Sequence, residues 1–336
     1  MFLDSITNSV INACKLGNLD FIKDNIHNVI NRAHIMIDND GTFSNENDED
    51  DVEMHNETVM NIFMSIAAGY GQLETVKYLE TVGGNIFCED NRPFGNACKF
   101  NQVDVVKYFI SKKVNITSQD FYGYCWSCKN GNMEIVKCLL DAYHDVIFVK
   151  NPYCLCLAVK NNNLPLVNLL LSYKTDPNVL GLYLFPNSFP VLCSSKEGYM
   201  DILYCLINNG ANVTINNGEV LSNVCAKGDL TLAKIIISNG VDPLSNNSWC
   251  ISKACLSGNV ELVQYLYELG TDIHNRDGMC MVYACDSGNV ALVKYVHKYI
   301  PLMVLKGKGL LKAVKHNHLD ILSYAHSQKI DLKNIK

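Results

Sequence analysis

The sequence predicts an all-α solenoid of about ten helix-loop-helix units with shortened connections between the units. The first basis is a repeat, since the segment from Ala254 to Leu266 recurs almost unchanged from Ala284 to Val296. The second is a Gly or Asn anchor that recurs at intervals close to 30 residues. The third is the helical periodicity of apolar residues around each anchor. The anchors are Gly17, Gly71, Asn101, Gly131, Asn162, Gly198, Gly228, Gly258, Gly288 and Asn317.

Each unit is predicted to hold one short helix on either side of its anchor. Gly and Asn adopt the left-handed backbone most readily, so the first helix should end at the anchor. Apolar pairs such as Leu262-Val263 follow the anchor and indicate the buried stripe of a second helix. About twelve positions after the anchor a second breaker, such as Gly270, should end that helix.

One unit shows a family resemblance especially well. Residues Gly258 to Ile273 read Gly-Asn-Val-Glu-Leu-Val-Gln-Tyr-Leu and then Leu-Gly-Thr-Asp-Ile, preceded by the small pair Ala254-Cys255. This pattern resembles an ankyrin repeat, and the resemblance extends over nearly the whole chain. It implies helix pairs stacked into a curved solenoid, linked by finger-like loops, with a concave groove that binds proteins.

The chain departs from the ankyrin pattern in two ways. No unit keeps the Thr or the His of the family's Thr-Pro-Leu-His start, and this predicts weaker local rigidity. The period is also about three residues shorter than the usual 33. The missing residues should come from the finger, for example between Asp272 and Met279, and we therefore expect no long hairpin fingertips.

The composition carries a further resemblance. Asn, Ile, Lys and Tyr are used heavily, and short-fingered arrays of this kind resemble the ankyrin-repeat proteins of giant amoeba-infecting DNA viruses. That resemblance implies a viral protein in the host cytoplasm, with the nucleus as the alternative. An intracellular location also agrees with the acid near the start, Asp4, and with the lack of any apolar run of about 18 residues, which predicts no membrane association. Fifteen cysteines are then expected as free thiols.

Two interruptions divide the array. We expect an N-terminal capping repeat over 1–37, a disordered acidic insertion over 38–57, repeats over 58–172, a short insertion over 173–188, and repeats with a polar C-terminal cap over 189–336. The acidic insertion holds nine of the 34 acids, so 25 acids against 28 bases remain outside it. A protein of net charge −6 is thus predicted to be a mildly basic solenoid with one acidic segment. That segment could compete with a partner for the basic groove.

No motif predicts catalysis. Cys125-Trp126-Ser127-Cys128 has the Cys-x-x-Cys spacing of redox or zinc sites. However, both cysteines fall in repeat columns, and Cys128 shares its column with Cys98 and Cys255, where a small buried side chain is expected. No phosphate-binding loop, zinc-protease motif or nucleophile elbow occurs. We therefore expect a protein that is not an enzyme and has no cofactor and no bound metal.

The candidate binding residues lie two positions before the anchors. In the ankyrin family this position ends the inner helix and faces the groove, which would place four lysines along it. Two aromatic residues three positions earlier are expected on the same surface, where aromatics beside cations form binding hot spots. The alternative interpretation is that lysine merely complements the helix dipole. The candidate groove residues are Lys99, Trp126, Lys129, Lys160, Lys196 and Tyr283.

The sequence thus favours a monomeric, non-catalytic scaffold that binds an unidentified and acidic protein partner. A substrate adaptor for a host ubiquitin ligase is the first alternative. A nucleic-acid binder using the lysines is the second, although only three arginines occur, Arg32, Arg92 and Arg276.

Overall fold

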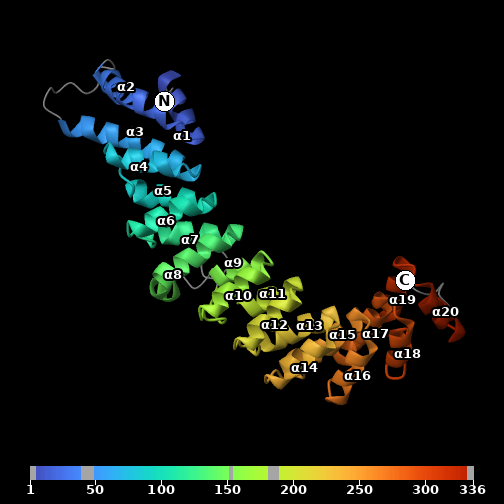
Figure 1. The fold of residues 1–336 in the computed structure, drawn as a ribbon. Coiled ribbons are helices and arrows are strands. Elements are labelled where there is room, and N and C mark those ends of the chain that lie inside the picture. Colours follow the sequence, from blue (N-terminus) through green and yellow to red (C-terminus); the bar gives the residue numbers. More distant parts are fainter. Residues whose placement is uncertain (1–4, 39–48, 151–153, 181–188, 331–336) are drawn as a thin grey trace. The chain divides into compact units, whose positions relative to one another are not determined.

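The chain folds into helix pairs that follow one another in sequence order (Figure 1). The computed structural model describes residues 5–38, 49–150, 154–180 and 189–330. Within these ranges every regular element is helical and no β-strand occurs. The predicted all-α class, with two helices in each unit, is therefore confirmed.

We call the first helix of each pair inner and the second outer. The inner helices are α1 (Ser5–Leu16), α3 (Glu49–Gly69), α5 (Cys88–Lys99), α7 (Ser118–Asn130), α9 (Cys154–Lys160), α11 (Pro190–Glu197), α13 (Glu219–Lys227), α15 (Ser245–Ser257), α17 (Asn275–Ser287) and α19 (Val304–Lys315). The outer helices are α2 (Leu19–Asp38), α4 (Leu73–Thr81), α6 (Val103–Ser111), α8 (Met133–Lys150), α10 (Leu164–Ser172), α12 (Met200–Asn208), α14 (Leu230–Ser238), α16 (Val260–Glu268), α18 (Val290–His297) and α20 (Leu319–Ser327). A short 3-10 helix, Ile215–Gly218, precedes α13.

The ten anchors adopt the predicted conformation. Each has a positive φ, for example +78° at Gly258 and +61° at Asn101, and each follows the end of an inner helix. The second breaker at Gly270 is also left-handed, with φ +87°. The outer helix α2 differs from the prediction because it continues past the breaker position. In α8 the backbone does leave the helical conformation at the breaker position, at Tyr143 (φ −138°), and a further helical stretch follows it.

The shortened connections are built from left-handed turns. In 276–278, the backbone of Arg276, Asp277 and Gly278 is left-handed at three successive residues. The turn is closed by the N–H of Gly278, which donates to the carbonyl of His274 at 3.1 Å. Equivalent left-handed segments occur at 89–91, 216–218, 246–248 and 305–307. Asn, Asp and Gly fill most of these positions because they tolerate this backbone best.

A polar residue directly after the anchor joins neighbouring units. The side-chain amide of Asn289 donates to the carbonyl of Gly258 at 2.9 Å, and its oxygen accepts the N–H of Leu292 at 3.3 Å. Gln72 and Gln102 also donate to the preceding unit, to the carbonyls of Lys15 at 3.0 Å and Gly69 at 3.1 Å, each two positions before the anchor. These bonds satisfy carbonyls at the ends of inner helices.

The core follows the repeat columns. The residue seven positions before each anchor is apolar and buried in all ten units: Val10, Met64, Phe94, Tyr124, Leu155, Val191, Leu221, Ile251, Met281 and Leu310. The cysteine column is buried too, including Cys98, Cys128 and Cys255. Burial raises the pKa of the Cys14 and Cys285 thiols to about 12, so they are protonated at neutral pH and weak nucleophiles.

The chain divides into two compact halves, residues 1–175 and 176–336, each of which holds several repeat units. The division lies inside the predicted short insertion, 173–188, whose residues 181–188 fall outside the described ranges. Within both halves each inner helix packs against the next, as α5 does against α7 and α15 against α17.

Of the predicted acidic insertion, 39–48 lie outside the described residues. From Glu49 the chain is helical where the sequence predicted a loop, and acids at a helix N-terminus agree with the helix dipole.

Candidate protein-binding face

Trp126 lies beside two lysines on the inner-helix face of the first half of the chain. Lys129 lies one helical turn after Trp126 on α7, so both side chains share one face. Lys99 comes from the end of the neighbouring helix α5. The ammonium nitrogens lie 4.3 Å (Lys129) and 4.6 Å (Lys99) from the centroid of the indole ring. Both distances are within the range of favourable cation–π contacts.

Two more aromatic rings extend this group. Tyr122 meets Trp126 edge to face, with ring centroids 5.9 Å apart. The ring of Phe100 lies 5.4 Å from the Lys99 ammonium and is 55% exposed. We call Lys99, Phe100, Tyr122, Trp126 and Lys129 the tryptophan cluster. It offers partly exposed aromatic surface together with two positive charges.

Asparagines from the following units fix the helix ends that carry the lysines. Asn130 donates to the carbonyl of Lys99 at 2.9 Å, and Asn161 donates to the carbonyl of Lys129 at 2.6 Å. These carbonyls end inner helices and would otherwise lack an intrahelical partner. The backbone of both lysines is thereby held in place next to the indole.

The structure brings only part of the predicted set together. Lys99, Trp126 and Lys129 form one cluster, whereas Lys160 lies exposed at the end of α9. Lys196 is exposed on α11 and belongs to the second half of the chain, where Tyr283 lies beside Trp249. A row of all four lysines with both aromatics would cross from the first half of the chain into the second, and it stays a prediction.

Sequence reasoning missed the group around Tyr283. Its ring meets Trp249 edge to face at 5.9 Å, and the Lys253 ammonium lies 5.0 Å from Trp249 and 5.8 Å from Tyr283. The Arg276 guanidinium carbon lies 3.9 Å from the indole centroid. The available signal was the spacing of Trp249 and Lys253, four residues apart on one helix face.

A second lysine column lies on the outer helices, six positions after the anchors. Each of four of its lysines lies over a tyrosine of the next unit. We call these pairs the lysine–tyrosine ladder: Lys23–Tyr78 at 5.8 Å, Lys77–Tyr108 at 5.9 Å, Lys234–Tyr265 at 5.1 Å and Lys294–Tyr324 at 5.4 Å. Where the next unit has Cys138 at the tyrosine position, Lys107 pairs with Glu134 at 2.8 Å instead. The column therefore links neighbouring units.

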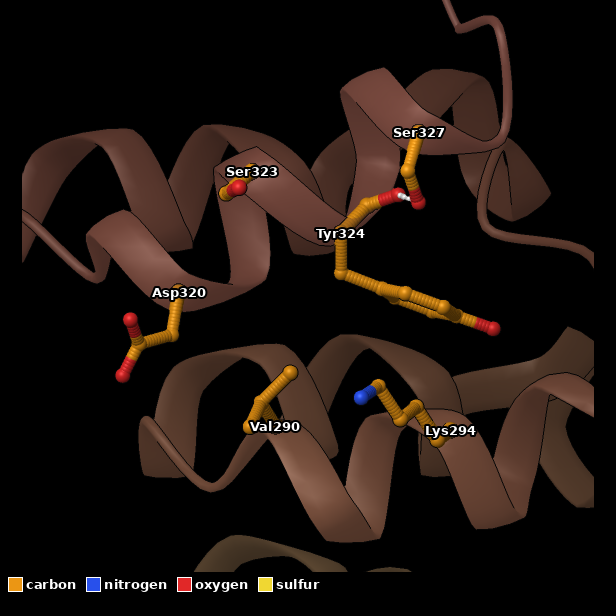
Figure 2. Close-up of a pocket in the computed structure, with 6 residues that line it drawn as sticks. All are labelled: Val290, Lys294, Asp320, Ser323, Tyr324 and Ser327. Atoms are coloured by element: carbon orange, nitrogen blue, oxygen red, sulfur yellow. Dashed lines mark hydrogen bonds between the residues drawn. The ribbon is translucent and has the colours of Figure 1, made fainter.

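A cleft of about 340 Å³ lies between α18 and α20 and is lined by Val290, Lys294, Asp320, Ser323, Tyr324 and Ser327 (Figure 2). The Lys294 amine sits below the Tyr324 ring, and the hydroxyl of Tyr324 is 2.9 Å from Nδ1 of His297. Asp320 points away from both side chains. The cleft is a rung of the lysine–tyrosine ladder, and repetition explains its residues.

The Cys-x-x-Cys motif is packed between helices. The thiol of Cys154, from α9, lies 4.0 Å from that of Cys125. Burial, together with contacts to Cys125 and Cys128, raises the pKa of the Cys154 thiol well above its ordinary value. Among the described residues no group of three His, Cys, Asp or Glu side chains is placed to hold a metal ion.

The predicted C-terminal cap is held by an acid. Asp286 pairs with Lys312 at 3.3 Å and with His316 at 3.1 Å, and its carbonyl contacts His318 at 3.1 Å. The position that carries lysine in the tryptophan cluster thus carries a neutralised carboxylate here.

No described helix combines the length and the apolarity that crossing a lipid bilayer requires. No protein-family model matches the chain, and no curated protein matches it.

Proposed function

We propose that the chain is an ankyrin-type scaffold that binds an acidic segment of another protein on the inner-helix face of its first half, residues 1–175. Its role is binding, not catalysis. The observation that carries the proposal is Trp126 holding two ammonium groups that no carboxylate neutralises within the described residues. Other lysines of the first half do have acidic partners, such as Lys77 with Glu74 and Lys112 with Glu80.

The physical basis is hot-spot chemistry. A partly exposed indole supplies rigid apolar contact area, and two cations beside it attract and orient carboxylates. Because asparagines already fix the lysine backbones, binding immobilises little additional structure. An acidic, extended partner would gain ion pairs that the free protein does not make.

Binding to short peptides tests the proposal. A fluorescein-labelled pool with Asp or Glu at alternate positions is titrated against the full chain, beside a pool with Lys at those positions. We expect saturable binding of the acidic pool, weakened about tenfold or more by Trp126→Ala and by Lys99→Gln with Lys129→Gln. Lys77→Gln, on the lysine–tyrosine ladder, is the matched control and should bind normally. Equal affinity of both pools, or no saturable binding at all, would overturn the proposal.

Single-stranded nucleic acid is the second candidate ligand, because alternating lysine and aromatic side chains also suit base stacking. Thymidine oligonucleotides in the same assay decide between the two. If the oligonucleotide binds Trp126-dependently and more tightly than the acidic pool, the nucleic-acid function replaces the protein-binding one. A host ubiquitin-ligase adaptor is a narrower form of the protein-binding proposal, and it gains no support from any described contact.

A further inference from the structure

The second half of the chain, residues 176–336, carries a separate cationic–aromatic group on its inner helices. Trp249 on α15 is contacted by the Arg276 guanidinium at 3.9 Å and by the Lys253 ammonium at 5.0 Å. Tyr283 on α17 closes the group, with its ring 5.9 Å from that of Trp249. We call these four residues the Arg276 cluster. It shares no residue with the tryptophan cluster.

Repetition does not explain Arg276. It occupies the first position of the left-handed turn 276–278, with φ +49° and ψ +50°. The same position is asparagine in two of the other turns, Asn216 and Asn246, and these tolerate this backbone at low cost, but it is Glu89 and Leu305 in the remaining two. What sets Arg276 apart is therefore its side chain. Its guanidinium lies over Trp249, a cation–π contact that asparagine, glutamate or leucine could not make.

The two cations of the cluster are not neutralised. No carboxylate within the described residues forms an ion pair with Arg276 or Lys253, and the Arg276 Nη2 contacts only the neutral Asn246 Oδ1, at 3.4 Å. Arg92, in contrast, is paired with Glu89. A guanidinium stacked on an aromatic ring keeps its N–H groups in the ring-parallel plane, where they can bind an oxyanion with two parallel hydrogen bonds.

The charge and reach of the cluster fit one dianion. The Arg276 guanidinium carbon and the Lys253 ammonium nitrogen lie 3.9 Å and 5.0 Å from the centroid of the same indole ring. Their separation therefore cannot exceed the sum of these two distances. A phosphate group, with a charge of about −1.5 to −2 and three acceptor oxygens, matches two cations. A carboxylate has only one charge and leaves the second cation unpaired.

We propose that the Arg276 cluster binds the phosphate of a phosphorylated serine or threonine in a partner protein. Arg276 forms the bidentate bond, Lys253 neutralises the second charge, and Trp249 and Tyr283 pack against the neighbouring peptide. The proposal concerns a different surface from the tryptophan cluster and does not depend on the function assigned there.

Matched peptide pools test this inference on the full chain. Three fluorescent pools with random flanks carry phosphoserine, serine or glutamate at the centre, and anisotropy gives each affinity. We expect the phosphoserine pool to bind about tenfold or more tightly than the other two. Arg276→Lys, which keeps the charge but removes the planar fork, should abolish this preference. Lys294→Gln, which changes an outer-helix lysine of the same half, should leave the preference for the phosphoserine pool unchanged.

The outcomes separate cleanly. Equal binding of the phosphoserine and glutamate pools, or an unaltered preference in Arg276→Lys with an unchanged melting curve, overturns the proposal. Tighter binding of phosphatidylinositol-phosphate vesicles than of the phosphoserine pool also overturns it and assigns the cluster to lipid headgroups. If Arg276→Lys melts earlier, Lys253→Gln replaces it as the test, because Lys253 lies within regular helix α15. Failure here would leave Trp126-dependent binding of acidic peptides unaffected.

Discussion

The lysine–tyrosine ladder and the tryptophan cluster contain the same kind of contact in two different settings. On the outer helices, Lys77 lies over Tyr108 of the next unit, and the same pairing recurs in three other places. On the inner helices, Trp126 occurs once and collects two lysines. A contact repeated at the period of the fold serves the stacking of units. A contact that departs from the period needs another explanation, and binding is the one we propose.

The comparison predicts that stability and binding can be altered separately. Outer-helix changes should weaken the stack without changing affinity, and changes at the tryptophan cluster should do the reverse. Because repeat arrays unfold unit by unit, a single melting temperature is a poor measure of such effects. Urea unfolding followed by hydrogen exchange resolves which units are affected.

The largest effect is expected beneath the ladder. Phe109 on α6 is fully buried and meets Phe94 edge to face at 6.2 Å. Phe109→Ala should lower the free energy of unfolding by about 3–5 kcal/mol, as measured by urea denaturation. Its affinity for acidic peptides, measured in the cold where the chain remains folded, should stay normal. Weakened binding in that folded state would contradict the separation of the two faces.

The next effect concerns the tryptophan cluster itself. Trp126→Phe keeps an aromatic ring but has a weaker attraction for cations, so we expect an intermediate loss of affinity between wild type and Trp126→Ala. The free energy of unfolding should change by less than about 1 kcal/mol, because surface cation–π contacts are worth about that much. Titration and denaturation of the same preparations check both numbers. A loss of stability that accounts for the loss of binding would assign Trp126 to the stack.

A smaller effect is expected from the ladder. Tyr78→Leu preserves apolar volume and removes the ring beneath Lys23, and we expect a loss of about 0.5–1 kcal/mol. Hydrogen exchange should increase mainly in α2 and α4, which this pair joins. If protection there is unchanged, the Lys23–Tyr78 contact at 5.8 Å contributes nothing and the ladder is only a solvated face.

The smallest effect is a pH dependence. Burial tends to raise the pKa of the Glu80 carboxyl, but hydrogen bonds from Lys112 and Tyr108 and the charge of Lys112 outweigh it and leave the pKa below its ordinary 4.5. The charged carboxylate therefore stabilises the fold above the ordinary pKa, and this stabilisation is lost as the pH falls through the lowered value. At neutral pH the free energy of urea unfolding should be slightly higher for wild type than for Glu80→Gln, and the difference should vanish in acid. A difference that grows on acidification would contradict this sign.

Much of the fold could be predicted because repetition averages out local ambiguity. Ten anchors, close to 30 residues apart except across the two insertions, fix where the inner helices end, and Gly17 or Asn101 alone would not have done so. The columns also explained why Cys128 is buried. The turns at 276–278 and its equivalents could not be predicted as left-handed, because three successive residues of that kind are rare. The sequence indicated only that the connections were short.

The candidate site was predicted in part for a related reason. Position relative to the anchor places Lys99, Trp126 and Lys129 on one face, since inner helices stack in register. It does not give the reach of a side chain from a turn, and Arg276 was therefore missed beside Trp249. The tyrosines of the ladder were missed because pairing between units requires the offset between neighbouring outer helices. Glu49 was assigned to a loop on charge alone, although a helix N-terminus accepts acids well.

The most direct test follows the fluorescence of Trp126. The chain has two tryptophans, so Trp249→Phe leaves Trp126 as the only indole emitter. Titration with an unlabelled acidic peptide pool should change the emission of this variant saturably, with the same midpoint as binding measured by anisotropy. Binding that saturates while the Trp126 emission stays constant would contradict the central claim that the tryptophan cluster is the binding surface.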